Sequence, residues 1–323
     1  MRLATRLAGL RPCGLAILAA TLVAATLLPA APAMAQEAAQ KSFQTAQQAA
    51  DALVAATKDN DVAALQQILG PQAASLVSSG DEAQDKNDRA HFVTLYEAHH
   101  RLITAGKGKM TLLVGKNEWA LPIPLVKSAA VWRFDSAEGA QELLYRRIGG
   151  NELAAIRVCH ALRQAQLDYA ATAHDGNAPG AYAQRFRSKP GTQNGLYWPA
   201  AEGEPQSPAG PFVADAEAEG YEYGKRHPYH GYYFRILKAQ GANAHGGARD
   251  YVVDGRMTGG FAILAYPAEY GASGVMTFLV SRRGTVYQKD LGEATAEAAK
   301  AITVFDPDSS WTRVPPAEPD TAN

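Results

Sequence analysis

Apolar residues recur every three or four positions in the first part of the chain, a spacing that predicts amphipathic helices. Ala46 and Leu53 share one face of TAQQAADALVAATKDND, and Asp61 precedes the apolar run VAALQQIL as a helix cap. A third helix is predicted over HFVTLYEAHHRLIT, with Leu102 on its apolar side. The charged segment GDEAQDKNDR, which begins at Gly80, has no such periodicity and predicts a surface loop.

From Lys109 onward the pattern changes to short apolar stretches that are rich in β-branched and aromatic residues. These stretches, MTLLVG, WALPIPLV and AVWRFD, predict strands. Pro122 and Pro124 confine the middle one to an edge or an irregular ribbon. A helix is predicted over GAQELLYRRI. Residues 36–148 are therefore predicted to form an α+β domain in which helices pack on a small sheet.

The second predicted domain, residues 149–314, begins with a helix over ELAAIRVCHALRQAQLDYA. One apolar face of this helix contains Ala155, Val158, Cys159, Leu162, Ala165 and Tyr169. A long loop rich in proline and glycine follows at residues 175–211, and its aromatic residues predict packing rather than disorder.

Alternating and apolar runs then predict an antiparallel β-meander, followed by a closing helix and a flexible tail at residues 315–323. The predicted strands are Gly231–Leu237, Arg249–Val253, Gly260–Tyr266, Val275–Val280 and Thr285–Lys289, and the closing helix is Ala294–Ile302. The fold class is thus α+β, with a long helix packed on an antiparallel sheet.

The stretch HPYHGYYFRILKAQG contains the densest group of reactive and aromatic side chains. It is interpreted first as a strand, and the bulk of Tyr232 and Phe234 predicts a central or near-central position in the sheet. A metal site is the alternative, in which His227 and His230 act with His245 or Glu269. Zinc sites usually show a second spaced pair of ligands, and none occurs here.

The amino terminus has the pattern of a secretory signal peptide. Three arginines precede an apolar run from Gly14 to Leu28, which is shorter than a membrane-spanning helix, and Ala33-Met34-Ala35 fits a cleavage site. Residues 1–35 are predicted to be removed on the general secretion route. The mature protein is then expected to be soluble, without a membrane span, in the periplasm or outside the cell.

Removal of that segment changes the formal net charge from −1 to −4, because it carries three arginines and no acidic residue. An evenly mixed, mildly acidic chain argues against nucleic acid as a partner. Only Cys159 remains after cleavage, so no intramolecular disulfide is expected. Its place on the apolar helix face predicts a buried thiol rather than a reactive one.

Known catalytic motifs are absent from the sequence. It contains neither a Gly-x-Ser-x-Gly elbow nor a His-Glu-x-x-His helix, so no catalytic or cofactor-binding residue and no cofactor is predicted. A cluster of aromatic residues is a candidate ligand surface for a glycan or an envelope protein. Its members are Tyr197, Trp198, Tyr229, Tyr232 and Tyr233. Packing of the long loop is the alternative role for these side chains.

Several longer motifs resemble a bacterial family described as domain of unknown function 2950. They are PYHGYYFRILKAQG, GGFAILAYPAEYGASGVMTFLV, FDPDSSW, NGLYWPA and RRIGGNELAAI. The resemblance extends over essentially the whole mature chain and implies an exported protein without a settled activity.

The later half also resembles the soluble head of type IV pilin-like proteins, since AIRVCHALRQAQLDYA is followed by GYYFRI, GGFAILAYP and GVMTFLVSRRGTVY. The processed hydrophobic helix of pilins is missing directly before residue 152, so the resemblance does not extend to filament assembly. The functional hypothesis is a non-enzymatic binding or scaffolding domain of the cell envelope. The alternative is an envelope hydrolase or metal-binding protein that uses the region of His227 and His230.

Overall fold

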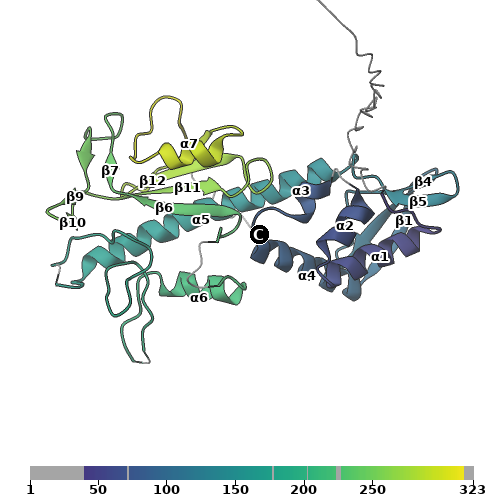
Figure 1. The fold of residues 1–323 in the computed structure, drawn as a ribbon, viewed down its shortest axis with the longest axis horizontal. Coiled ribbons are helices and arrows are strands. Elements are labelled where there is room, and N and C mark those ends of the chain that lie inside the picture. The colour runs from purple at the N-terminus through teal and green to yellow at the C-terminus, as the bar shows by residue number, and fades with distance from the viewer. Residues whose placement is uncertain (1–39, 71–72, 177, 202, 223–226, 316–323) are drawn as a thin grey trace, which may run out of the picture. The chain divides into compact units, whose positions relative to one another are not determined.

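The computed structural model describes residues 40–70, 73–176, 178–201, 203–222 and 227–315 (Figure 1). The predicted signal peptide and all but the first residue of the predicted tail lie outside these ranges. The α+β fold is confirmed, because the described residues form helices and antiparallel sheets. None of the helices in these ranges combines the length and the apolar composition that crossing a bilayer requires.

The first helices form as their local signals predict. Helix α1 (Ala46–Lys58) begins at a capping box in which Thr45 and Gln48 bond each other's backbone. Helix α2 (Val62–Leu69) begins at Asp61, whose carboxylate accepts the Ala64 N–H at 2.9 Å. The short helix α3 (Ala74–Val77) follows.

The segment predicted as a charged loop is instead the start of helix α4 (Glu82–Ala98). The side chain of Asp81 accepts the N–H of Gln84 and so caps this helix. The helix also ends earlier than predicted, at Ala98, because the following residues pair with β2. Leu102 therefore lies on strand β1 (His100–Gly106), opposite Leu112.

The first sheet has the order β1-β2-β4-β5, and β3 pairs with β2. The remaining strands of this sheet are β2 (Lys109–Val114), β3 (Trp119–Ala120), β4 (Leu125–Ser128) and β5 (Val131–Phe134). Residues from this sheet and from α1, α2, α3 and α4 share one hydrophobic core cluster.

Helix α5 (Ala140–Ala171) joins two stretches that the sequence predicts as separate helices. It continues through Gly149 and Gly150, the predicted boundary between the two domains. Leu143 packs against the amino-terminal core, whereas Ala155 and Val158 belong to the second core. The division at residues 148 and 149 therefore stays a prediction, with one continuous helix on both sides of it.

The second sheet is antiparallel, with the order β14-β13-β12-β11-β6. Its strands are β6 (Tyr232–Leu237), β11 (Ala262–Pro267), β12 (Met276–Ser281), β13 (Val286–Asp290) and β14 (Thr312–Arg313). All six residues of β11 are buried. Figure 1 shows α5 on one side of this sheet and α7 (Thr295–Ala301) on the other, which explains the continuous apolar run in β11.

Strand β6 lies at the edge of this sheet, so the prediction of a central position is wrong. Among the strands of the described residues its neighbour is β11, where Phe234 lies opposite Ala265 and Ile236 opposite Ile263. Four of its six residues are half-buried. Bulky side chains here cover the neighbouring strand and loops instead of filling the centre of a sheet.

Smaller elements complete the second half. Strands β7 (Ala239–Gln240) and β8 (Arg249–Asp250) form one ribbon, and β9 (Val252–Val253) and β10 (Arg256–Met257) form another. The predicted strand at residues 249–253 is thus divided between two ribbons. The long loop is anchored by buried Leu196 and by Gln166, whose amide bonds both backbone groups of Ala183. It leads into helix α6 (Gly210–Ala218).

Candidate functional site

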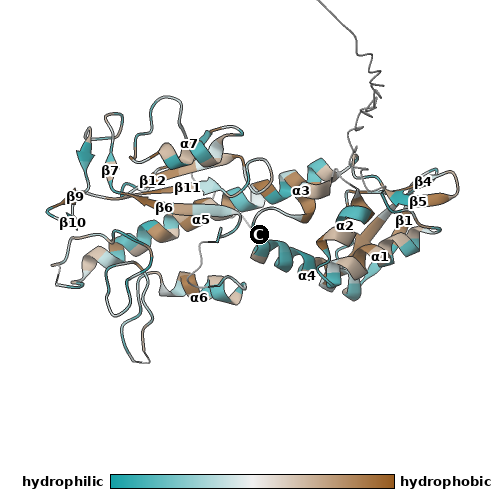
Figure 2. Cartoon of the chain, viewed as in Figure 1, coloured by the Kyte–Doolittle hydropathy of each residue, from teal (hydrophilic) through white to brown (hydrophobic). Residues whose placement is uncertain are grey.

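A cavity of about 1210 Å³ opens between α4, α5 and the first sheet. Most of its wall is apolar. Helices α1, α2, α3, α4 and α5 and strands β2 and β3 each contribute at least one lining residue. Representative residues are Leu53, Leu65, Leu76, Phe92, Leu95, Trp119 and Leu143. Figure 2 shows that the first turns of α4 are strongly hydrophilic, and this helix brings acidic groups to one part of the wall, while α5 contributes Arg146, Arg147 and Arg157. A cavity of this kind is typical of small-molecule sites.

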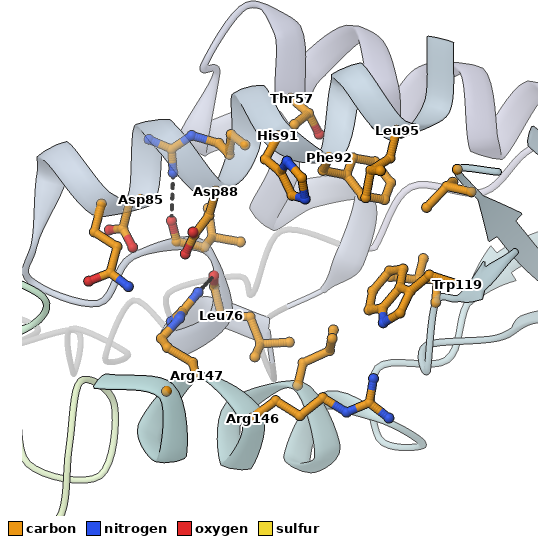
Figure 3. Close-up of a pocket in the computed structure, with 18 of the residues that line it drawn as sticks. Thr57, Leu76, Asp85, Asp88, His91, Phe92, Leu95, Trp119, Arg146 and Arg147 are labelled. Atoms are coloured by element: carbon orange, nitrogen blue, oxygen red, sulfur yellow. Dashed lines mark hydrogen bonds between the residues drawn. The ribbon is translucent and has the colours of Figure 1, made fainter. Parts of the chain in front are cut away.

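The acidic part of the wall consists of Asp85 and Asp88, one helical turn apart on α4. Figure 3 shows both side chains on the side of α4 that faces Arg147 of α5. The side chain of Asp85 is buried, with the residue only 5% exposed, and its Oδ2 accepts the Ser79 N–H at 2.9 Å. Its Oδ1 is also buried and has no hydrogen-bond partner within the described ranges.

Asp88 differs from Asp85 because solvent in the cavity can reach it. Its side chain has no hydrogen bond or ion pair to any residue that the structure describes. The surrounding protein raises the pKa of Asp88 by desolvation, and the positive charge of Arg147 opposes this shift. Asp88 thus has acceptor oxygens directed to the cavity and no protein donor to fill them.

Arg147 and Arg89 direct hydrogen bonds to the carboxyl end of α3. The Arg147 guanidinium donates to the carbonyl oxygens of Ser75 and Leu76 (Figure 3), and Arg89 donates to that of Val77 at 3.0 Å. Carbonyl groups at a helix end lack intrahelical partners, so the two arginines satisfy them. Burial lowers the pKa of Arg147, while Asp85 and Asp88 raise it.

A chain of amides connects this wall to the second half of the molecule. Asn151 donates to the Ser273 carbonyl at 2.9 Å and accepts from Gln84 Nε2 at 2.8 Å. The Ser273 carbonyl can only accept, which fixes the orientation of the Asn151 amide and, through it, that of Gln84. Gln84 Oε1 is left buried without a partner in the described part of the chain.

The start of α4 also contacts the loop before β6. Asp81 Oδ2 accepts from the Tyr221 hydroxyl at 3.0 Å and from the Gly231 N–H at 2.8 Å. Burial raises the pKa of Asp81, and these hydrogen bonds oppose that shift. Burial is also the largest cause of the raised pKa of Tyr221, followed by the charge of Asp81.

Residues 229–232 form a tight turn in the most reactive part of the sequence. The N–H of Tyr232 donates to the Tyr229 carbonyl at 3.1 Å, and the two residues between them have positive φ, 48° for His230 and 72° for Gly231. Two positive φ angles at the centre of a turn are the pattern of type I′, which matches the twist of a hairpin. The pair His-Gly therefore makes a turn that leads into β6.

A family described as "Protein of unknown function (DUF2950)" matches residues 40–314. The chain belongs to the DUF2950 family. No curated protein and no solved structure matches it. The similarity to pilin-like heads is accordingly not confirmed.

The predicted metal-ligand histidines of this DUF2950 protein lie in different surroundings. His227 is exposed, His230 lies 3.5 Å from a Glu219 carboxylate oxygen, and His245 contacts the guanidinium of Arg283 at 3.2 Å. The described residues contain no group of three or more His, Cys, Asp or Glu side chains arranged to hold a metal ion. Metal binding by these histidines stays a prediction.

The predicted aromatic ligand surface requires correction at two positions. Tyr232 is fully buried and donates its hydroxyl to the Met276 carbonyl at 2.9 Å, and Trp198 is buried beside the rings of Tyr169 and His174. Both side chains are part of the second core, so neither presents a surface to a ligand. Tyr197, Tyr229 and Tyr233 are half-buried and pack against that core.

Gln84, Asp85, Asp88 and Arg147 were not among the site residues predicted from the sequence. The first three lie in the segment predicted as a loop, where a three-residue spacing does not place side chains on one face. A signal was present, because an Asp before a run of good helix formers is a helix start. With α4 begun at Glu82, Asp85 and Asp88 share a face, as residues three apart do.

Proposed function

We propose that this DUF2950 protein acts by binding a small ligand in the cavity between α4 and α5. The observation that carries the proposal is the combination of an apolar wall with the unpaired, buried Oδ1 of Asp85. A buried acceptor without a donor is costly, by about 1–3 kcal/mol, and is rare in folded proteins. A ligand that supplies the donor relieves this cost only when it is bound.

The site of action is proposed to be the cell envelope or the outside of the cell. This part of the proposal rests on the predicted signal peptide, residues 1–35, and on the export that membership of the family implies. The ligand or partner is then a molecule of the envelope, a class that includes glycans and envelope proteins.

A hydrolase that uses His230 is the second candidate. It is supported by the 3.5 Å contact between His230 and Glu219 and by the place of His230 in the cavity wall. A carboxylate beside a histidine can orient the ring for proton transfer. Binding is preferred because the partnerless acceptors in the wall can accept hydrogen bonds from a ligand, whereas no hydrogen bond between the His230 ring and a serine, threonine or cysteine side chain occurs within the described residues.

The test of ligand binding is a cavity-filling substitution with a matched control on the same helix. Leu143 lines the cavity, whereas Leu153, ten residues further along α5, is 60% exposed. Titration calorimetry with n-octanol, a neutral probe with an apolar chain, is expected to show binding to the unmodified protein and to Leu153→Trp. Leu143→Trp is expected to abolish it. Equal binding to both variants, or no binding to any form, would contradict the proposal.

A further inference from the structure

We infer that the ligand of this cavity is an organic amine whose ammonium group is bound by the acidic end of the cavity and whose apolar body lies along the rest of α4. The inference rests on the proposed binding function and adds the chemical class of the ligand. Some hydrogen-bonding groups of the wall have protein partners and others do not, and the second set indicates the ligand's head group.

The buried polar atoms of the wall that have no hydrogen-bond partner among the described residues are acceptors. Gln84 Oε1 and Asp85 Oδ1 are buried and have no partner within the described residues, and the Asp88 carboxylate is open to the cavity without one. Asp85 is the decisive member, because the residue is only 5% exposed and its Oδ1 still has no hydrogen-bond partner among the described residues. An ammonium group has three N–H donors and no acceptor, which complements these acceptors.

The two arginines nearest the carboxylates, Arg147 and Arg89, are engaged with other groups. Arg147 and Arg89 donate to carbonyl oxygens of α3, and no hydrogen bond joins either guanidinium to Asp85 or Asp88 in the described structure. The arginines therefore reduce the repulsion between the two carboxylates without filling their lone pairs. A ligand ammonium would form charge-assisted hydrogen bonds at this position, which are the strong kind.

The next turns of α4 provide apolar side chains that can contact the apolar body of the ligand. Phe92 and Leu95 follow Asp85 and Asp88 on one face of α4, and Figure 3 shows Trp119 beside them. Asp88 and Leu95 are seven residues apart, a rise of about 10 Å along the axis, which is roughly the length of an eight-carbon chain. An amine of that length would reach from the two carboxylates to the part of the cavity lined by Leu95 and Trp119.

An anionic ligand is the competing chemistry, because Arg146 and Arg157 also line the cavity. Arg146 is already paired with Glu142 at 2.8 Å, and Arg157 is exposed to solvent. A hydrated or already paired cation gains less from a new partner than an unpaired buried acceptor does. The wall thus favours the amine.

The experiment compares three probes that share a chain length and differ in the head group. n-Octylamine, n-octanoate and n-octanol are titrated at neutral pH into the unmodified protein and into Asp85→Asn, Asp88→Asn and Asp168→Asn. Asp168 is an exposed aspartate further along α5, outside the cavity, so its variant controls for the change in net charge. Asp88 has no hydrogen bond to lose, so Asp88→Asn tests the inference even if Asp85→Asn folds poorly.

Octylamine is expected to bind the unmodified protein roughly ten-fold or more tightly than octanol, as one charge-assisted hydrogen bond predicts. That preference should be lost in Asp88→Asn and kept in Asp168→Asn. Tighter binding of octanoate would overturn the inference, because the arginines would then select the head group. Equal binding of all three probes would overturn it as well, yet leave the proposed binding function standing. Absence of binding by every probe would overturn the proposed function itself.

Discussion

Gly231→Ala is the substitution whose effect the structure specifies most closely. Gly231 has a φ of +72°, and a Cβ added to it would lie 2.5 Å from Asn151 Nδ2 and 3.0 Å from Ser273 Cβ. The Asn151 side chain is buried and holds two hydrogen bonds, one to the Ser273 carbonyl and one from Gln84. An alanine at this position therefore strains the backbone and displaces that amide.

The two costs can be estimated separately. The left-handed conformation costs an alanine about 1–2 kcal/mol. Displacement of Asn151 leaves buried polar groups unsatisfied, which costs about 1–3 kcal/mol more. Gly231→Ala should thus lower the free energy of unfolding by about 2–5 kcal/mol in total.

Gly271→Ala is the matched control, because Gly271 has nearly the same φ, +74°, and open space where its Cβ would lie. Gly271→Ala introduces the same backbone strain but no steric clash of the added Cβ. Both variants reduce the conformational entropy of the unfolded chain equally, because each replaces one glycine by alanine. Urea unfolding of the unmodified protein and both variants measures the difference, which should be about 1–3 kcal/mol. Equal destabilisation by the two substitutions would show that Asn151 adapts without loss and would refute the reasoning.

Three further outcomes are expected. Phe278→Ala, in the centre of β12, should cost about 3–5 kcal/mol in urea unfolding, and Phe234→Ala on edge strand β6 roughly half as much; the reverse order would contradict the strand positions. Cys159 is fully buried, which raises the pKa of its thiol to about 12, so a bulky disulfide reagent should label it only in denaturant; labelling of the native protein would contradict its burial. Desolvation by the surrounding protein raises the pKa of Asp88, so its carboxylate is charged above that pKa and becomes protonated as the pH falls through it. Octylamine affinity should therefore decrease on acidification at a pH above the ordinary aspartate pKa, and Asp88→Asn should lack this decrease.

Elements with strong local signals could be predicted from the sequence. VAALQQIL has its own cap in Asp61 and forms α2, and the apolar run of β11 forms a strand because helices cover both of its faces. The position of β6 in its sheet could not be predicted, since strand order depends on pairing between distant segments. Bulk at Tyr232 and Phe234 indicated burial, but an edge strand can bury its residues under loops.

The candidate site could not be predicted from the sequence for a different reason. Its acidic half and its arginine lie about sixty residues apart in the sequence, on α4 and α5, and only the tertiary structure brings them together. Charged residues on a helix are usually solvated, so the composition of GDEAQDKNDR favoured a surface segment. Because this segment was predicted as a loop, the three-residue spacing of Asp85 and Asp88 was not recognised as placing both carboxylates on one face of a helix.

Asp81, the N-cap of α4, lies on the same face as Asp85 and Asp88 of its first turns, and the three carboxylates differ in how many hydrogen bonds they accept. Asp81 accepts from Gln84, Tyr221 and Gly231. Within the described residues, the Asp85 side chain accepts only from the Ser79 N–H, and that of Asp88 has no donor. A carboxylate whose lone pairs are filled by backbone and tyrosine holds the fold, because removing it breaks those contacts. A carboxylate that is unfilled contributes nothing comparable to the fold and is available to a ligand. Along about two helical turns, the role of these carboxylates thus changes from stabilising the fold, at Asp81, to being available to a ligand in the cavity, at Asp88.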